Sequence, residues 1–435
     1  MKRLAYWLYG MIFHLFRICP VKRKKVVLFM IHNSKFKGSL KFIYEEMKKR
    51  DKEFEFIILS KKQLFSISGK GIKKVLSLCK AGFTFYVIWN YHLATAEYIF
   101  LNDNFQPLVY MNVSKKAKVV QVWHGVGAFK RFGLSTETDS LVRYCTSKGN
   151  QKLTHLFVSS KQVIPYYAEA MGVEERKIFP DGIPVTDYYF DETKKQEAKK
   201  KVYQKYPELV GKKVILYTPT FRKSDEENKT LLNHFNYRKI RAQLGEDWAI
   251  LIRLHPQIKK EVQIRGNGCY DVTEYGDIKE LFLVTDILIN DYSSTVVEFA
   301  LLKKPILLYA YDLEQYDRGF YRDYKKYAPG VIVYNQEELI SLLKQICLDS
   351  RICFVSADNL KDKSDLEKNN DLSSKAYLIE NNDFSKNINL GNKLDLEKNC
   401  YLKKEKLENF LNIQYDKMDG QATKRVVDRV LGKRD

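Results

Sequence analysis

Short apolar runs alternate with longer amphipathic stretches along most of this chain. The first run, Lys25–Met30, is rich in β-branched residues, and apolar runs of this length predict buried strands. Helical spacing of apolar residues follows over 39–49 and recurs between most later runs. Strands are expected at 25–30, 54–60, 97–102, 118–123, 156–159, 213–217, 248–254, 287–290 and 305–309. Because strands that alternate with helices form βαβ units, the pattern predicts an α/β fold with parallel sheets.

The alternation stops once and then restarts, which predicts two domains. A polar, Lys-rich stretch at about 187–206 separates an N-terminal Rossmann-like domain, 24–195, from a C-terminal one, 196–349. Two such domains in tandem would face each other across a cleft. Residues 350–403 are rich in Asn, Asp, Lys and Ser, which is typical of a low-complexity insertion. Residues 404–435 regain an apolar helical pattern and are expected to form a C-terminal helix.

The N-terminal segment, 1–23, is apolar and aromatic, with basic residues on both sides. A helix over 4–19 would be about 24 Å long, shorter than the roughly 30 Å hydrocarbon core of a bilayer. No small-residue cleavage site follows it, so a signal peptide is not expected. The composition favours a helix that lies in a membrane interface. A helix packed on its own domain is the alternative.

Charge and cysteine content narrow the class of protein. The 435 residues carry a formal net charge of +21, which suits a nucleic acid, an acidic membrane or a phosphorylated substrate. A Lys-rich solvated surface would give the same net charge. The sequence contains no RRM signature or zinc finger, and the charge is spread along the chain, so a nucleic-acid partner is not expected. Seven cysteines without a CxxC pair favour reduced thiols in the cytoplasm over disulfides or a zinc site.

Polar side chains follow four of the expected strands. His124 ends one strand of the first domain, and Arg222, His255 and the stretch 291–295 end strands of the second. Ligands of open α/β sheets bind beyond the carboxyl ends of the strands. A cleft between the two domains would bring these groups together.

The stretch WHGVGAFKRFG, 123–133, carries the first of these residues. His124 is either a catalytic group or a strand-end histidine satisfied by the backbone. Gly125 and Gly127 permit close backbone approach. Lys130 and Arg131 offer cationic contacts to an anionic ligand.

The stretch INDYSSTVVEFA, 289–300, is typical of a strand, a tight turn and a helix. Ser293, Ser294 and Thr295 stand at the expected helix start, where hydroxyls cap exposed amides. Amides and macrodipole together suit an anion such as a diphosphate, although ordinary capping would show the same residues. The sequence holds neither a Walker lysine motif nor GxGxxG, which argues against P-loop and dinucleotide enzymes.

In order, these stretches resemble a known family. WHG…KRFG, LYTPTFR, LIRLHP and INDYSSTVVEFA with AYDLEQY and RGFY resemble the CDP-glycerol glycerophosphotransferases, which make teichoic acids and related polymers. The resemblance covers about 24–345 and the closing DGQATKRVV. It implies a GT-B-like fold with the nucleotide held by the C-terminal domain. The family often reads WHGTP, whereas Val126 and Gly127 stand in place of Thr-Pro here.

The resemblance implies a transfer reaction. Glycerol phosphate would pass from CDP-glycerol to a hydroxyl of a lipid-linked or polymer acceptor, with release of CMP. Some members use CDP-ribitol, and a nucleotide-sugar glycosyltransferase of the same fold is a rival. The family's motif histidines match His124 and His255. Its pyrophosphate-binding positions match Arg222, Ser293, Ser294 and Thr295.

Roles follow for the matched residues. His124 would take the acceptor proton, since a histidine titrates near neutral pH. His255 and Arg222 would hold the diphosphate and stabilise the charge of the departing CMP. Asp291 would bind the substrate, or would instead orient a histidine or the turn 291–295, which we call the serine turn. Glu298 would reach a ribose hydroxyl. No cofactor and no metal are expected, because CDP-glycerol is a substrate and no carboxylate cluster stands out. An anionic membrane is the expected surface, with peripheral attachment at the cytoplasmic face; the oligomeric state stays open.

Overall fold

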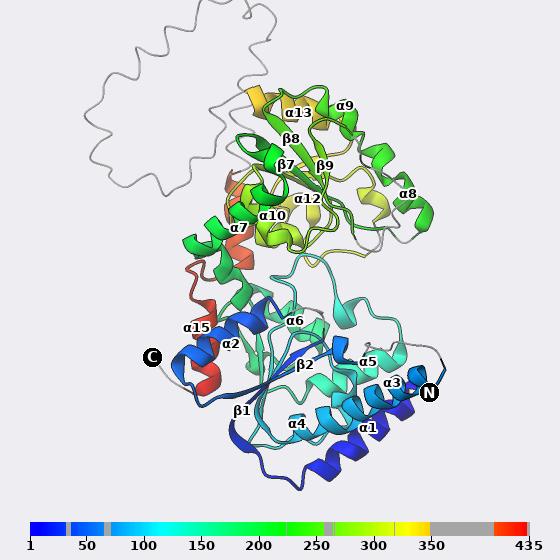
Figure 1. Cartoon of the computed structure of the whole chain (residues 1–435). Coiled ribbons are helices and arrows are strands. Elements are labelled where there is room, and N and C mark those ends of the chain that lie inside the picture. The colour runs from blue at the N-terminus through cyan, green and yellow to red at the C-terminus, as the bar shows by residue number, and fades with distance from the viewer. Residues whose placement is uncertain are drawn as a thin grey trace, which may run out of the picture.

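Two lobes, each built on a six-stranded parallel sheet, make up the protein (Figure 1). The computed structural model describes residues 1–31, 36–64, 71–222, 224–255, 264, 266–316, 318–348 and 404–432. The predicted α/β class and the two Rossmann-like domains are therefore confirmed. The segment predicted as a low-complexity insertion, 350–403, lies outside the described residues.

The N-terminal sheet has the strand order β2-β1-β3-β4-β5-β6. Its strands are β1 (Lys22–Met30), β2 (Glu55–Ser60), β3 (Ala96–Leu101), β4 (Lys118–Gln121), β5 (His155–Phe157) and β6 (Ile178–Phe179). In the centre, Val27 pairs with Ile57 on one side and Ile99 on the other. These residues lie in one apolar cluster, and the alternate residues Val26 and Leu28 belong to a second, so both faces of the sheet are covered.

Helices and short turns connect these strands. The helices are α1 (Lys2–Phe16), α2 (Ser39–Arg50), α3 (Ile72–Phe83), α4 (Asn90–Ala94), α5 (Ser140–Asn150) and α6 (Ile164–Met171). A π-helical turn, Thr84–Trp89, joins α3 to α4. α5 begins at Asp139, whose carboxylate accepts the amides of Leu141 and Val142.

The C-terminal sheet has the order β12-β11-β10-β7-β8-β9. Its strands are β7 (Lys213–Thr218), β8 (Trp248–Ile252), β9 (Cys269–Asp271), β10 (Ile287–Asn290), β11 (Ile306–Tyr309) and β12 (Val331–Val333). Around it lie α7 (Glu192–Lys205), α8 (Asp225–His234), α9 (Tyr237–Arg241), α10 (Ile278–Val284), α11 (Thr295–Ala300), α12 (Tyr324–Tyr327) and α13 (Gln336–Leu348). β7, β8 and β10 are neighbours, so their carboxyl ends meet at one edge.

The predicted strands are all present, with ends that shift by at most three residues. The structure adds β6, β9 and β12, which the sequence pattern did not predict. Each is two or three residues long and lies at an edge of its sheet. A run this short shows no periodicity, and an edge strand needs fewer apolar residues.

Helix α1 packs one face on its own domain. Tyr9, Gly10 and Phe13 are buried, and α1 lies against α4 and the 3-10 turn η3 (Gln106–Tyr110). The opposite face exposes a row of apolar side chains, namely Leu4, Trp7, Leu8, Met11 and Leu15. The segment is thus packed on its own domain, as one sequence-based alternative expected. It also has the exposed apolar face that a helix in a membrane interface requires.

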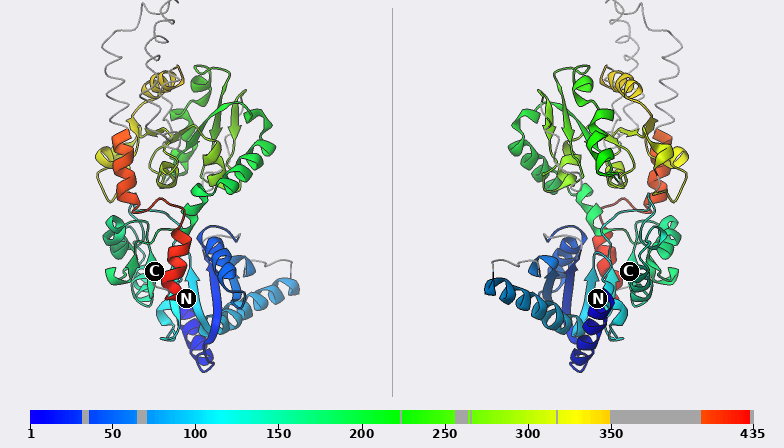
Figure 2. Two further views of the ribbon diagram at one scale, coloured as in Figure 1. Left: turned by 90° about the vertical axis from the view of Figure 1, so that its left-hand side faces the viewer. Right: turned by 90° about the vertical axis from the view of Figure 1, so that its right-hand side faces the viewer.

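The closing part of the chain returns to the N-terminal domain. It holds two helices instead of one, 404–414 and α15 (Ala422–Leu431). The views from both sides show this segment running from the C-terminal lobe down to the N-terminal sheet (Figure 2). α15 starts where Asp187 accepts the amides of Ala422 and Thr423, at 2.9 and 2.8 Å. Its buried valines join the core of the N-terminal sheet.

Candidate active site

Three of the predicted site residues follow adjacent strands of the C-terminal sheet. Arg222 lies four residues beyond β7, His255 three beyond β8, and Asp291 directly after β10. Since the strands are parallel neighbours, all three lie at the same edge. We call this edge the donor edge, after the donor diphosphate that the family resemblance leads us to expect there.

Arg222 is held by two carboxylates. Its Nε and Nη2 donate to Asp312 at 2.6 and 3.0 Å, and its Nη1 donates to Asp291 at 3.0 Å. The guanidinium also lies over the rings of Tyr292 and Tyr311. Although burial disfavours its charge, Asp291 and Asp312 raise the pKa of Arg222 above its ordinary value. Arg222 therefore links β7, β10 and the segment after β11.

Asp291, the first residue of the serine turn, bonds to two other segments of the domain. Its carboxylate accepts the Thr220 amide at 2.9 and 3.0 Å, and its carbonyl accepts the Tyr324 hydroxyl at 2.8 Å. The side chain is almost fully buried. Asp291 thus fixes the chain between β7, β10 and α12, and its role toward the substrate, the turn or a histidine stays a prediction.

The serine turn itself is closed by short-range bonds. The amide of Ser293 donates to Asn290 Oδ1 at 3.1 Å, and the Thr295 hydroxyl donates to Ser293 Oγ at 3.0 Å. Ser294 is the N-cap residue of α11 and is exposed, and its side chain makes no capping bond. The three residues lie together at the donor edge, as predicted; binding of a diphosphate there stays a prediction.

Glu298 is bonded to the connection between the two domains, and its contact with a ribose hydroxyl stays a prediction. Its Oε2 accepts the hydroxyl of Tyr189 at 3.0 Å, and Tyr189 lies in the turn Pro184–Phe190 that joins the two domains. Burial raises the pKa of Glu298. The contact ties α11 to the interdomain connection.

The His255 ring packs against Phe221 at a tilt of 34°, with ring centroids 4.5 Å apart. Burial lowers its pKa, and the charges of Lys130 and Arg253 lower it further. A neutral imidazole is therefore favoured at pH 7, with one N–H to donate and one nitrogen to accept. Lys130 comes from the other domain, so the two domains share this region.

His124 follows β4 at the facing edge of the N-terminal sheet. Its Nδ1 lies 3.3 Å from the Asn102 carbonyl and 3.8 Å from an Asp103 carboxylate oxygen. The ring packs on Trp123, whose φ of 50° turns the chain sharply before the histidine. A Cβ on Gly125 would meet the Trp123 ring at 3.4 Å. His124 keeps 29% of its side chain exposed, which leaves the ring accessible to a ligand.

The stretch 123–133, which we call the WHG loop, contacts the C-terminal domain beyond His124. Lys130 forms an antiparallel bridge with Phe320, and the Arg131 amide donates to the Gly319 carbonyl at 3.2 Å. The Tyr321 amide returns a bond to the Phe129 carbonyl. KRF of the first domain thus pairs with RGFY of the second. The Arg131 side chain is exposed and lies near the Tyr321 ring.

The charge of Lys130 interacts with the groups of the donor edge. Burial and then the charge of Arg318 lower its pKa to about 8, while Asp291 acts in the opposite sense. Arg222 also lowers it. Lys130 therefore lies within electrostatic range of Arg222, Asp291 and His255, which the sequence placed in another domain.

Sequence reasoning missed two carboxylates of this region. Asp312 pairs with Arg222, and Asp103 faces His124. Asp312 stands in AYDLEQY, which contributed to the family resemblance without a role. Asp103 follows β3, the neighbour of β4, so strand adjacency was the available signal. Over the ranges that the structure describes, no three His, Cys, Asp or Glu side chains gather as metal ligands would.

The sequence model described as CDP-glycerol:poly(glycerophosphate) glycerophosphotransferase matches residues 11–353. The chain belongs to this family. The family expected from the WHG, LIRLHP and NDYSS stretches is thus confirmed.

Curated relatives include both polyol types. The chain is 33% identical over 351 residues to the teichoic acid poly(ribitol-phosphate) polymerase of Bacillus spizizenii, covering 79% of this chain and 54% of that protein. It is 31% identical over 315 residues to the teichoic acid glycerol-phosphate primase of Bacillus subtilis, covering 70% and 80%. The chain spans 54 to 65% of the length of the ribitol-phosphate polymerases that it matches.

Solved structures confirm the GT-B-like fold. The wall teichoic acid polymerase TagF matches with a TM-score of 0.69 at 22% identity, over 99% of this chain and 95% of that chain.

Among the helices described here, none combines the length and apolarity that a membrane crossing requires.

Proposed function

We propose that this protein transfers a polyol phosphate from a CDP-linked donor to a hydroxyl of a lipid-linked or polymer acceptor and releases CMP. Glycerol phosphate is the first candidate, and ribitol phosphate is the second because relatives of both kinds match. The family and the position of Lys130 support this proposal. That lysine, on the loop that begins with His124, lies in the field of the donor edge.

The proposed chemistry is a displacement at phosphorus. The acceptor oxygen forms a bond to the β-phosphorus of the donor, and the bond from that phosphorus to the bridging oxygen breaks. The acceptor proton passes to Nε2 of His124, and CMP leaves with the bridging oxygen. The Asn102 carbonyl beside Nδ1 supports this proton position, because a bonded Nδ1–H leaves Nε2 as the acceptor. Asp103 would stabilise the imidazolium that forms.

The donor edge would bind the diphosphate. Lys130 supplies a positive charge, and a neutral His255 can donate one hydrogen bond to the departing phosphate. The contacts of Arg222 with Asp291 and Asp312 favour a role in shaping this edge as well as in binding. Ser293, Ser294 and Thr295 add hydroxyls and amides beside it.

Peripheral attachment to an anionic membrane at the cytoplasmic face is part of the proposal. The exposed apolar row of α1 supports it, and α3 offers a second one. α3 has no buried residue and projects from the N-terminal lobe (Figure 2). Ile72, Val75, Leu76 and Phe83 recur at helical spacing and are exposed, and the same helix carries Lys73, Lys74 and Lys80.

One assay tests the proposal. The purified protein is incubated with a synthetic lipid-linked acceptor and CDP-glycerol, CDP-ribitol or UDP-sugars in parallel, and products are identified by mass spectrometry. We expect CMP release and acceptor masses that grow by one polyol phosphate. Release of UDP with glycosylated acceptor would instead identify a nucleotide-sugar glycosyltransferase. No turnover of either CDP-polyol by folded protein would contradict the proposal.

A further inference from the structure

A short stretch of the C-terminal segment, 412–416, joins both domains beside the WHG loop. On the N-terminal side, the Asn412 carbonyl accepts Gln162 Nε2 at 3.0 Å and the Ile413 carbonyl accepts Ser160 Oγ at 2.5 Å. On the other side, the Tyr415 hydroxyl donates to the Val297 carbonyl in α11 at 2.9 Å. The stretch is therefore fixed before it meets the loop.

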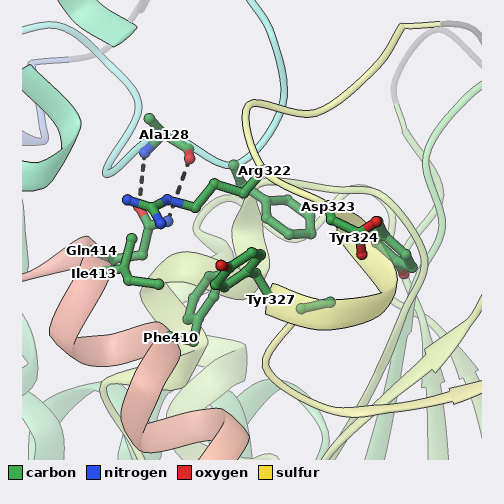
Figure 3. Close-up of a pocket in the computed structure, with 10 residues that line it drawn as sticks. Ala128, Arg322, Asp323, Tyr324, Tyr327, Phe410, Ile413 and Gln414 are labelled. Atoms are coloured by element: carbon green, nitrogen blue, oxygen red, sulfur yellow. Dashed lines mark hydrogen bonds between the residues drawn. The ribbon is translucent and has the colours of Figure 1, made fainter. Parts of the chain in front are cut away.

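Gln414 pairs with the main chain of Ala128 in the loop. Its Oε1 accepts the Ala128 amide at 2.8 Å, and its Nε2 donates to the Ala128 carbonyl at 3.3 Å. The side chain is 2% exposed, so water does not compete for these groups. Figure 3 shows the two bonds at one end of a small pocket, which Phe129, Tyr327 and Phe410 also line. Gln414 thus takes the place that a neighbouring strand would have beside Ala128.

Gly127 is fitted to the same side chain. Its φ is +63°, and a Cβ there would collide with Gln414 Oε1 and would lie 2.9 Å from Val297 Cγ1. Its carbonyl accepts the hydroxyl of Tyr167 at 3.0 Å. The loop is therefore held from two sides at adjacent residues, and its shape there depends on a residue 286 positions away.

We propose that Gln414 is a positioning residue for the transfer reaction. It fixes the loop between His124, which would take the acceptor proton, and Lys130, which would face the donor phosphates. The spacing between base and cation would thereby be set by a residue that touches neither substrate. This inference rests on the proposed function, because positioning is measured through turnover.

The test compares Gln414→Leu and Gln414→Glu with Ser160→Ala. Leu fills a similar volume without either bond, whereas Glu keeps an acceptor for the Ala128 amide but has no donor for its carbonyl. Ser160→Ala removes a buried hydrogen bond from the same stretch without touching the loop. Hydrogen exchange of the peptide that contains Ala128, thermal unfolding, kcat and the donor KM are measured for each.

For Gln414→Leu we expect faster exchange at the Ala128 amide and a kcat at least about tenfold lower, with little change in donor KM, because misplacement of reacting groups lowers turnover. Gln414→Glu should keep the slower exchange of that amide while kcat falls. Ser160→Ala should retain both kcat and slow exchange at Ala128. Unchanged exchange in Gln414→Leu, or a kcat loss no larger than that of Ser160→Ala at equal stability, overturns the proposal. If the wild type turns over no CDP-polyol, the proposed function fails, and the exchange data still report whether Gln414 holds the loop.

Discussion

Arg222 and Asp312 form a two-point ion pair, with Nε to Oδ2 at 2.6 Å and Nη2 to Oδ1 at 3.0 Å. A lysine cannot reproduce this planar fork. Arg222→Lys should therefore lower the free energy of unfolding by about 1.5–3 kcal/mol, the range for buried bonds to charged groups. Urea unfolding measures the loss. The exposed Arg238→Lys is the control and should change stability by less than about 0.5 kcal/mol; equal losses for both variants would contradict a role for the ion pair.

The strand ends were accessible to sequence reasoning because local patterns set them. The apolar runs at β7, β8 and β10 are continuous, so the polar residues that follow are visible without a structure. Contacts between residues far apart in the sequence could not be predicted in this way. Asp312 lies 90 residues from Arg222, and Gln414 lies 286 from Ala128. Glu298 was assigned to a ribose from its helix position alone, and its partner Tyr189, 109 residues away, was not predicted.

His124 should be essential for turnover. His124→Ala should lower kcat at least about 10²-fold, the contribution of a general base. Asp103→Asn should cause a smaller loss, since the Asn102 carbonyl still holds the ring. Steady-state CMP release measures both. His92→Gln is a matched control, because α4 leads into the opposite end of β3, and it should keep wild-type turnover.

Lys130 should give the reaction an alkaline limit. Its pKa of about 8 means that its positive charge is present below that pH and lost above it. Since kcat/KM reports groups of the free enzyme, kcat/KM for the CDP-polyol should fall as pH rises through about 8. Lys130→Arg should move this fall to higher pH, because arginine stays charged. Identical profiles for the two proteins would exclude Lys130 as the titrating group.

Gly127 should not tolerate a side chain. Gly127→Ala should destabilise the fold by about 1–2 kcal/mol for its left-handed backbone. The collision with Gln414 adds about 1–3 kcal/mol of overpacking. Gly211→Ala isolates the first effect, since Gly211 has φ +76° and nothing within 4 Å of its Cβ position. Chemical unfolding of the two variants gives the difference. The same φ explains the departure from WHGTP, because proline requires a φ near −65°.

The exposed row of α3 should bind anionic vesicles. Leu76→Glu should reduce vesicle binding at least about tenfold, because burial of a leucine contributes about 1.5–3 kcal/mol. Val210→Glu makes the same charge change at a side chain of equal exposure, 64% against 63%, in the other domain. Flotation on vesicles with acidic lipids compares them. Equal binding of both variants would show that α3 does not contribute to membrane binding. Point variants are preferable to deletion of 1–23, because that deletion would also remove the buried Tyr9 and Phe13.

The return of α15 to the N-terminal sheet affects how the protein is made. Val426, Val427 and Val430 share a core with Val26 and Leu28 of β1. During synthesis, the first lobe to leave the ribosome therefore lacks part of its interior until the second lobe has been translated. The second lobe waits for a shorter part of the same segment, because Leu407, Phe410 and Leu411 belong to its core. We expect both lobes to complete their packing only when this closing segment has been translated, with the N-terminal lobe last because α15 follows the helix at 404–414.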